Sequence, residues 1–131
     1  KLTVRAVAQE LGFSSTPARD AINRLAGEGA LVYSGPKTVI VPVLTEENLR
    51  EITLIRLALE GLAAQLAVNN VQDEDIEKIR DIQSKINDAL DTRSFDKVLR
   101  HNKDLHFYVY SMSGMPRLLS MIEGAWLRVG P

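Results

Sequence analysis

The feature that most constrains the fold is a short turn between two amphipathic runs near the start of the chain. Gly12 follows the first run, and the second run opens with Ser14-Ser15-Thr16-Pro17. Glycine often ends a helix in the left-handed conformation, hydroxyl residues favour the position before a helix, and proline fits the first helical turn. The pattern predicts a helix over residues 4–11, with Thr3 as its N-cap, and a second helix to about residue 26. The positions expected to face inward are Val4, Val7, Ala8, Leu11, Ala18, Ala21, Ile22 and Leu25.

Two short runs of β-branched and aromatic residues follow, at 31–33 and 38–41, around the turn Ser34-Gly35-Pro36-Lys37. They predict a β-hairpin. From Thr45 onward, apolar residues recur at helical spacing in four segments, about 45–69, 73–91, 94–113 and from Pro116 to the chain end. The expected fold is therefore mainly α. A winged helix-turn-helix with a small hairpin wing occupies residues 1–43, and an all-helical antiparallel bundle occupies residues 44–131.

Composition narrows the function classes. The chain has 131 residues, a formal net charge of −1 and no cysteine, which excludes a disulfide scaffold and thiolate chemistry. No apolar run reaches the length of about 20 residues that a membrane helix needs, so we expect a cytoplasmic protein without a membrane partner. Residues 1–43 hold five basic and three acidic residues, so the first third has a net positive charge and the rest of the chain has a net negative charge. This distribution is compatible with nucleic-acid binding.

The start of the second predicted helix has the chemistry of a DNA contact. Its hydroxyl groups, free backbone N–H groups and positive dipole end suit phosphate, and Arg19 can reach a guanine edge or a phosphate. Lys37, at the tip of the hairpin, is placed for a minor groove. The expected DNA-binding residues are Arg5, Ser14, Ser15, Thr16, Pro17, Arg19 and Lys37. The alternatives are an Arg19 side chain that is solvated or engaged with Asp20 or Asn23, and solvated charges at Arg5 and Lys37.

These residues resemble the winged helix of the GntR family, in which a TPxR stretch opens the recognition helix and an RLxxEGxL stretch closes it. The resemblance extends to the ligand-binding (FCD) domain of the FadR branch. The segments that carry it are Thr16-Pro17-Ala18-Arg19, Arg24-Leu25-Ala26-Gly27-Glu28-Gly29-Ala30-Leu31, Arg56-Leu57-Ala58-Leu59-Glu60, Leu105-His106 and Trp126-Leu127-Arg128-Val129-Gly130-Pro131.

The resemblance implies a homodimer, a pseudo-palindromic double-stranded operator and a small carboxylate effector. The family often has arginine at the position of Ser15, and its wing is usually of the Gly-Arg-Gly type, where this chain has Gly35-Pro36-Lys37. The family's first helix and its last sensing helices are expected to lie outside this sequence.

Asn102 and His106 lie four residues apart on one helical face, within an apolar stripe. They form either a hydrogen-bonded core pair or part of a metal site. The resemblance implies a divalent metal such as zinc, nickel or manganese at this position, which holds the effector carboxylate, although asparagine in place of aspartate removes a charge. Arg56 is the candidate for direct effector binding, but pairing with Glu60 one turn later is the simpler interpretation.

Three functions compete. The first is a ligand-responsive DNA-binding transcription regulator, a repressor released by a small carboxylate metabolite. The second is a constitutive DNA-binding or interaction module without an effector. The third, a metal-dependent enzyme built around His106, lacks a second suitable histidine, any cysteine and an adjacent carboxylate set. The sequence therefore favours a regulator that is not an enzyme.

Overall fold

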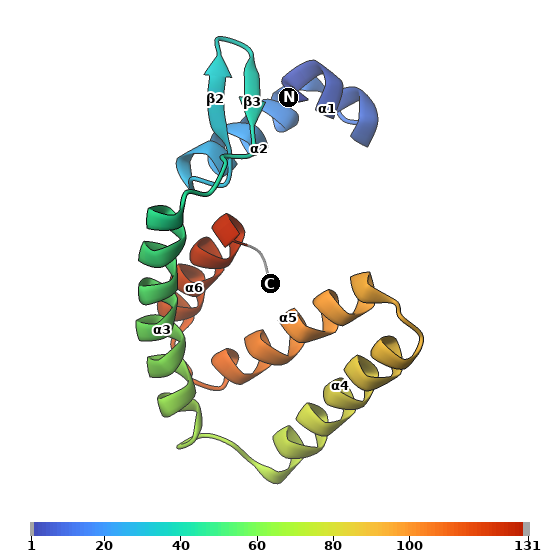
Figure 1. Ribbon diagram of the computed structural model, residues 1–131, viewed down its shortest axis with the longest axis vertical. Coiled ribbons are helices and arrows are strands. Elements are labelled where there is room, and N and C mark those ends of the chain that lie inside the picture. The colour runs from blue at the N-terminus through green and yellow to red at the C-terminus, as the bar shows by residue number, and fades with distance from the viewer. Residues whose placement is uncertain (1, 130–131) are drawn as a thin grey trace.

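The computed structural model describes residues 2–129 and places a winged helix at one end of four longer helices (Figure 1). The winged helix consists of β1 (Leu2–Thr3), α1 (Val4–Leu11), α2 (Ser15–Gly27), β2 (Val32–Gly35) and β3 (Thr38–Ile40). Thr3 Oγ1 accepts a hydrogen bond from the backbone N–H of Ala6 at 3.2 Å, as expected of an N-cap. Gly12 has a φ of 70°, in the left-handed region. Both helix boundaries predicted around the turn are confirmed.

The wing is a three-stranded antiparallel sheet in the order β1-β3-β2. Val39 of the central strand is paired with Leu2 on one side and with Tyr33 on the other. The hairpin was predicted and β1 was not, because two residues are too few to carry a strand pattern. Ile22, Leu31 and Val39 form the buried core that fastens the sheet to α2. The hairpin is thereby held beside the helix-turn-helix.

The helical part consists of α3 (Glu46–Ala67), α4 (Asp73–Asp91), α5 (Phe95–Ser111) and α6 (Pro116–Val129). These bounds agree closely with the predicted segments. Thr45 Oγ1 caps α3 by accepting a hydrogen bond from Asn48 N at 3.2 Å. Among the described residues, no helix is both long and apolar enough to cross a bilayer.

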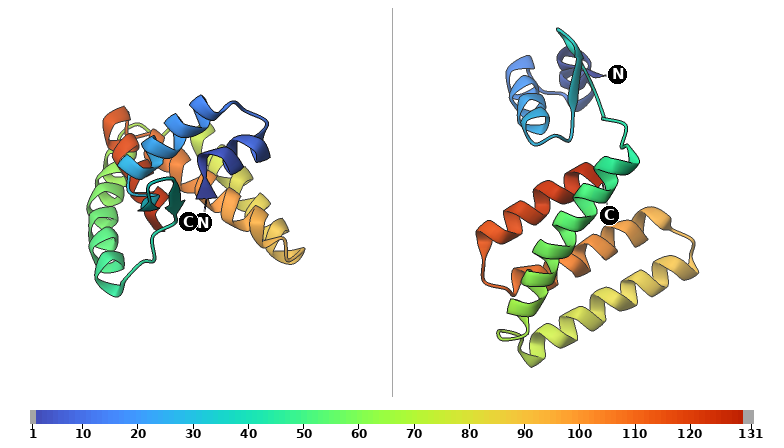
Figure 2. Two further views of the ribbon diagram at one scale, coloured as in Figure 1. Left: turned by 90° about the horizontal axis from the view of Figure 1, so that it is seen from above. Right: turned by 60° about the vertical axis from the view of Figure 1, so that its left-hand side comes forward.

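The four helices form two antiparallel pairs, α3 with α6 and α4 with α5, and α5 also contacts α3 (Figures 1 and 2). The buried core of the helical part lies where α3, α5 and α6 meet. It contains Ala63, Tyr110, Leu118, Ile122 and Trp126. Because α4 packs mainly on α5, the pairs do not enclose one common core.

Several apolar residues lie on the helix faces that periodicity predicts to be buried, but they are exposed instead. They are Leu11, Ala21, Leu49, Ile55, Leu62, Ile76, Leu90, Phe95 and Leu99. Helical periodicity predicts which face of a helix is apolar, but whether another element covers that face depends on tertiary packing. The helices were therefore predicted correctly, and the extent of their burial was overestimated.

Candidate nucleic-acid interface

A concave surface that encloses a volume of about 560 Å³ lies between the start of α1, the part of α2 up to Asn23 and the hairpin. Four of the residues predicted to bind DNA line it together, namely Arg5 from α1, Ser15 and Arg19 from α2, and Lys37 from the hairpin turn. They are far apart in the sequence and come from three different elements. The winged helix thus gathers three cations and a hydroxyl around one depression.

All four side chains are exposed. Within residues 2–129, no ion pair or hydrogen bond holds the side chain of Arg5, Arg19 or Lys37. Of the alternatives considered for Arg19, an ion pair with Asp20 is therefore not formed in the structure. Cationic groups without a protein partner are available to phosphate oxygens or base edges.

The start of α2 is open to solvent. Ser14 is its N-cap residue by backbone conformation, but its side chain makes no capping hydrogen bond. Ser14, Thr16 and Pro17 are exposed at this end, although they lie outside the lining of the concave surface. The unsatisfied N–H groups and the positive dipole end of α2 therefore remain available to an anion.

A hydrogen bond ties the hairpin to α2. Tyr33 Oη of β2 donates to Asn23 Oδ1 at 2.5 Å, and both residues line the concave surface. This contact holds Lys37 and Arg19 on opposite sides of the same depression. This contact was not predictable from the sequence, because tyrosine on a strand and asparagine on a helix carry no signal of mutual contact.

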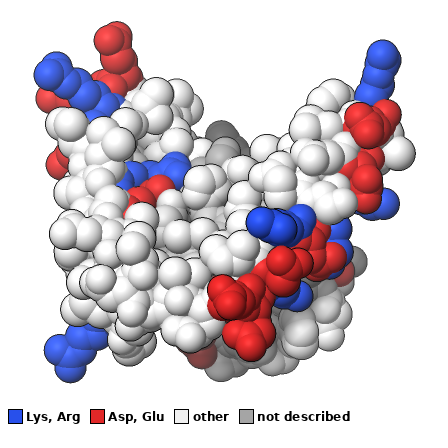
Figure 3. All heavy atoms as spheres, turned by 90° about the horizontal axis from the view of Figure 1, so that it is seen from below, with Lys and Arg blue, Asp and Glu red and all other residues white. Residues whose placement is uncertain are grey.

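The charges of the helical part are placed differently. The first turn of α4 carries Asp73, Glu74 and Asp75. Acidic side chains gather on the face seen from the end opposite the winged helix (Figure 3). The acidic surface therefore points away from the concave surface, and the net charge of the chain is a poor guide to the charge of its winged helix.

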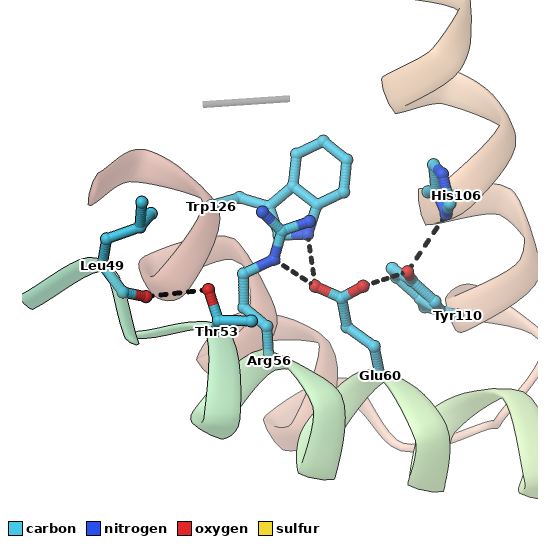
Figure 4. Close-up of polar contacts among 7 residues, drawn as sticks. All are labelled: Leu49, Thr53, Arg56, Glu60, His106, Tyr110 and Trp126. Atoms are coloured by element: carbon cyan, nitrogen blue, oxygen red, sulfur yellow. Dashed lines mark hydrogen bonds and ion pairs between the residues drawn. The ribbon is translucent and has the colours of Figure 1, made fainter. Parts of the chain in front are cut away.

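A second polar site lies in the core of the helical part, around Glu60 of α3 (Figure 4). Its carboxylate accepts hydrogen bonds from Arg56 Nε at 2.5 Å, Trp126 Nε1 at 2.8 Å and Tyr110 Oη at 2.5 Å. His106 Nδ1 lies 3.1 Å from the Tyr110 hydroxyl. The network joins α3, α5 and α6, and the sequence identified only its Arg56–Glu60 pair.

The ionisation of this site follows from its contacts. Burial opposes ionisation of the Glu60 carboxyl, but the hydrogen bonds from its three donors outweigh burial and lower its pKa. Burial, together with the hydrogen bond to Glu60, raises the pKa of Tyr110. Glu60 is therefore an anion, and Tyr110 is a neutral donor, at neutral pH.

The predicted metal ligands are not brought into a complete site. His106 contacts Tyr110 rather than Asn102, so the alternative of an Asn102–His106 core pair is wrong in its partner. Asn102 is half-buried and makes no side-chain hydrogen bond within residues 2–129. These residues contain no cluster of three His, Cys, Asp or Glu side chains that would hold a metal ion. Asn102 and His106 would supply two donors, which is fewer than a stable transition-metal site uses. Metal binding by these residues stays a prediction.

Arg56 is engaged within the protein. Besides its ion pair with Glu60, its guanidinium lies 4.3 Å from the centre of the Trp126 ring. The interpretation that Arg56 pairs with Glu60 is confirmed. Its role in effector binding stays a prediction, and an effector carboxylate would compete with Glu60 for the same guanidinium.

Comparison with known proteins identifies the family. The family model of the FCD domain matches residues 51–131. The HTH-type transcriptional regulator McbR of Escherichia coli is 33% identical over 131 residues, which are 100% of this chain and 59% of McbR. The Nta operon transcriptional regulator of Aminobacter aminovorans is 28% identical over 123 residues, 94% of this chain and 58% of that regulator. The chain thus spans less than two thirds of these relatives.

Solved structures agree. The E. coli McbR/YncC structure superposes with a TM-score of 0.94 at 33% identity, over 99% of this chain and 61% of that one. A GntR regulator from Rhodococcus sp. RHA1 has a TM-score of 0.74 at 18% identity, over 97% of this chain and 60% of that one, and supports the fold alone. The chain belongs to the GntR family of transcriptional regulators, in the FadR branch that carries an FCD domain.

Proposed function

We propose that the chain acts as a homodimeric, ligand-responsive repressor that binds operator DNA through its winged helix. The observation that carries the proposal is the concave surface at which Arg5, Ser15, Arg19 and Lys37 meet, exposed and without protein partners among the described residues. In this arrangement α2 enters the major groove, where Arg19 contacts a base edge or phosphate. Lys37 approaches the neighbouring minor groove, and Arg5 contacts the flanking backbone.

The helical part would act as the sensor. A small carboxylate metabolite bound there would favour an arrangement of the dimer's two winged helices that no longer matches the operator. Such a ligand shifts the equilibrium only by the difference in its affinity for the two arrangements. Arg56 is a candidate contact, since a ligand carboxylate can replace Glu60 as its partner. A cytoplasmic location accords with this role.

The alternative is a constitutive DNA-binding module without an effector. It is favoured by the Glu60 network, in which Arg56 already has a carboxylate partner. A panel of small organic acids, with and without divalent metals, separates the two possibilities. An acid that raises the melting temperature and weakens operator binding supports the sensor, whereas no response to any of them supports the constitutive module.

The DNA-binding proposal is tested with operator sequences selected from random DNA. Replacing Arg19 by alanine removes a base-edge or phosphate contact, so the Arg19→Ala variant should lose about 1–3 kcal/mol of binding free energy. Lys37→Ala should weaken binding to all sequences alike and reduce the slope of log affinity against log salt by about 1. Fluorescence anisotropy at several salt concentrations measures both effects.

Arg50→Ala is the matched control, because Arg50 is an exposed arginine in the first turns of α3, away from the concave surface. It should bind like the wild type. Wild-type affinity and sequence preference in the Arg19→Ala variant would contradict the proposal that α2 reads the operator.

A further inference from the structure

The C-terminal end of the reading helix α2 lies against the last turn of α6. Arg128 Nε of α6 donates a hydrogen bond to the backbone carbonyl of Glu28 at 3.0 Å. Glu28 is the C-cap residue of α2, where the final carbonyls of a helix lack partners within the helix. In Figure 1, α6 runs back along α3, and its C-terminal end faces the winged helix. An arginine 100 residues away in the sequence therefore caps the reading helix.

Gly29 makes this approach possible. Its φ is 76°, and a Cβ atom at this position would lie 3.1 Å from Arg128 Nε and 3.2 Å from Arg128 Cζ. Such distances are tighter than ordinary van der Waals contact. The guanidinium thus lies directly against the backbone just after α2. A side chain at position 29 would clash with it.

The charges at this junction are complementary. The C-terminal end of a helix carries a partial negative charge, so the Arg128 cation stabilises the end of α2. On the α2 side, Arg24 pairs with Glu28 at 2.8 Å. This hydrogen bond, and a weaker attraction from Glu123 of α6, raise the pKa of Arg24. Each side of the junction therefore presents one cation and one anion.

The α6 side of the junction is firmly placed. Ile122 is fully buried against α3, and Trp126, two residues before Arg128, donates to Glu60 of α3. The covalent connection between the two parts is the segment 41–45, which has no regular structure and exposes Val41 and Val43 (Figure 2, right). Among the hydrogen bonds between described residues, the one from Arg128 to Glu28 alone joins the winged helix to the helical part.

We propose that Arg128 is a specificity-determining residue for DNA, because its contact with the C-cap of α2 orients the winged helix relative to the helical part. This inference rests on the proposed function as a dimeric DNA-binding regulator. Two winged helices of fixed orientation bind operators with one distance between half-sites. Winged helices that are free to turn about segment 41–45 bind operators with several such distances. Arg128 acts as a positioning residue, since it lies at the opposite end of α2 from the Ser14–Arg19 surface.

The first test needs no DNA. The chain has no cysteine, so Glu10→Cys on α1 and Ser120→Cys on α6 give one spin label on each part. Pulsed electron spin resonance then measures the distribution of distances between them. We expect a narrow distribution in the otherwise unchanged protein, a broad one with Arg128→Ala and an intermediate one with Arg128→Lys, which keeps a donor. Arg117→Ala, an exposed arginine at the other end of α6, is the control and should stay narrow.

The second test measures spacing specificity. Selected operators are rebuilt with half-sites moved together or apart by single base pairs. We expect Arg128→Ala to reduce the preference for the best spacing over its neighbours by about 2- to 10-fold, the range expected when one exposed hydrogen bond is lost. Binding to an isolated half-site should stay at the wild-type level, and Arg117→Ala should behave as the wild type.

The outcomes separate this inference from the function on which it rests. Equal label distributions in the wild type and the Arg128→Ala variant, or an unchanged spacing preference, overturn the role of Arg128. Failure of the wild type to bind any selected operator overturns the proposed function instead, while the label experiment still decides whether Arg128 fixes the orientation of the winged helix.

Discussion

At the scale of single residues, Glu60 shows how one half-buried carboxylate organises the helical part. Its three donors come from its own helix, from α5 and from α6, so the carboxylate joins elements that are far apart in the sequence. A carboxylate that is partly withdrawn from water is stable only when such donors replace the water that it loses. Removing the charge should therefore weaken the packing of α3, α5 and α6 against one another.

Replacing Glu60 by glutamine should lower the free energy of unfolding at neutral pH by about 1–3 kcal/mol. The charge-assisted hydrogen bonds become neutral ones, and one of the donors meets the NH2 group of the amide, which cannot accept its hydrogen bond. The pKa of Glu60 is lowered in the folded state from its ordinary value of 4.5. Its contribution is thus present above about pH 4.5 and is lost as the pH falls through the folded-state pKa. The wild type should lose more stability than Glu60→Gln between about pH 6 and pH 3, measured by urea unfolding.

Glu51→Gln on the same helix is the control for this prediction, because Glu51 is exposed and has no hydrogen-bond partner among the described residues. It should retain the neutral-pH stability of the wild type. A Glu60→Gln variant with the stability and acid sensitivity of the wild type would show that the network does not hold the helices together.

At the scale of elements, the turn between α1 and α2 depends on a backbone conformation that side chains disfavour. Gly12 adopts a φ of 70°, and its N–H contacts the last carbonyls of α1. This turn sets the angle at which α1 packs across α2, and hence the position of Arg5 relative to Arg19. The reading surface is therefore a product of the turn as much as of its cations.

Two glycine substitutions test this point against each other. Gly12→Ala should destabilise the protein by about 1–2 kcal/mol, because alanine is strained in the left-handed region. Gly27→Ala should be neutral or stabilise it by up to about 1 kcal/mol, because Gly27 is helical and a Cβ there meets no atom within 4 Å. Thermal and urea unfolding measure both changes. Equal destabilisation by the two substitutions would contradict the assigned turn geometry.

At the scale of the whole molecule, a small winged helix is joined to the larger helical part by one exposed segment and, among the hydrogen bonds between described residues, by the one from Arg128. One reading helix covers a single half-site, so the proposed dimer should be needed for tight binding. Analytical ultracentrifugation with a labelled duplex should find two chains on a full operator. A duplex with one half-site should bind one chain with much lower affinity. One chain on the full operator, at the affinity of the half-site duplex, would contradict the dimeric mode of reading.

Local sequence signals determined the elements of this protein. The Gly12 turn, the hydroxyl and proline residues before α2, the hairpin turn and the cap at Thr45 each act within a few residues, so their outcome does not depend on the rest of the chain. The strand β1 escaped prediction because two residues form a strand only when β3 is present to pair with them. The candidate DNA-binding residues were predictable for the same local reason, since most of them lie in or beside the turn.

Tertiary structure alone decided what distant residues do together. Periodicity marked the apolar faces of α3 to α6, but only packing showed that they form two pairs and leave residues such as Leu49 and Phe95 exposed. Likewise, nothing local in the sequence indicates that Glu60 meets Tyr110 and Trp126, or that Arg128 caps α2. Caps and turns are set by the few residues around them, whereas contacts between segments depend on how the whole chain excludes water from its core.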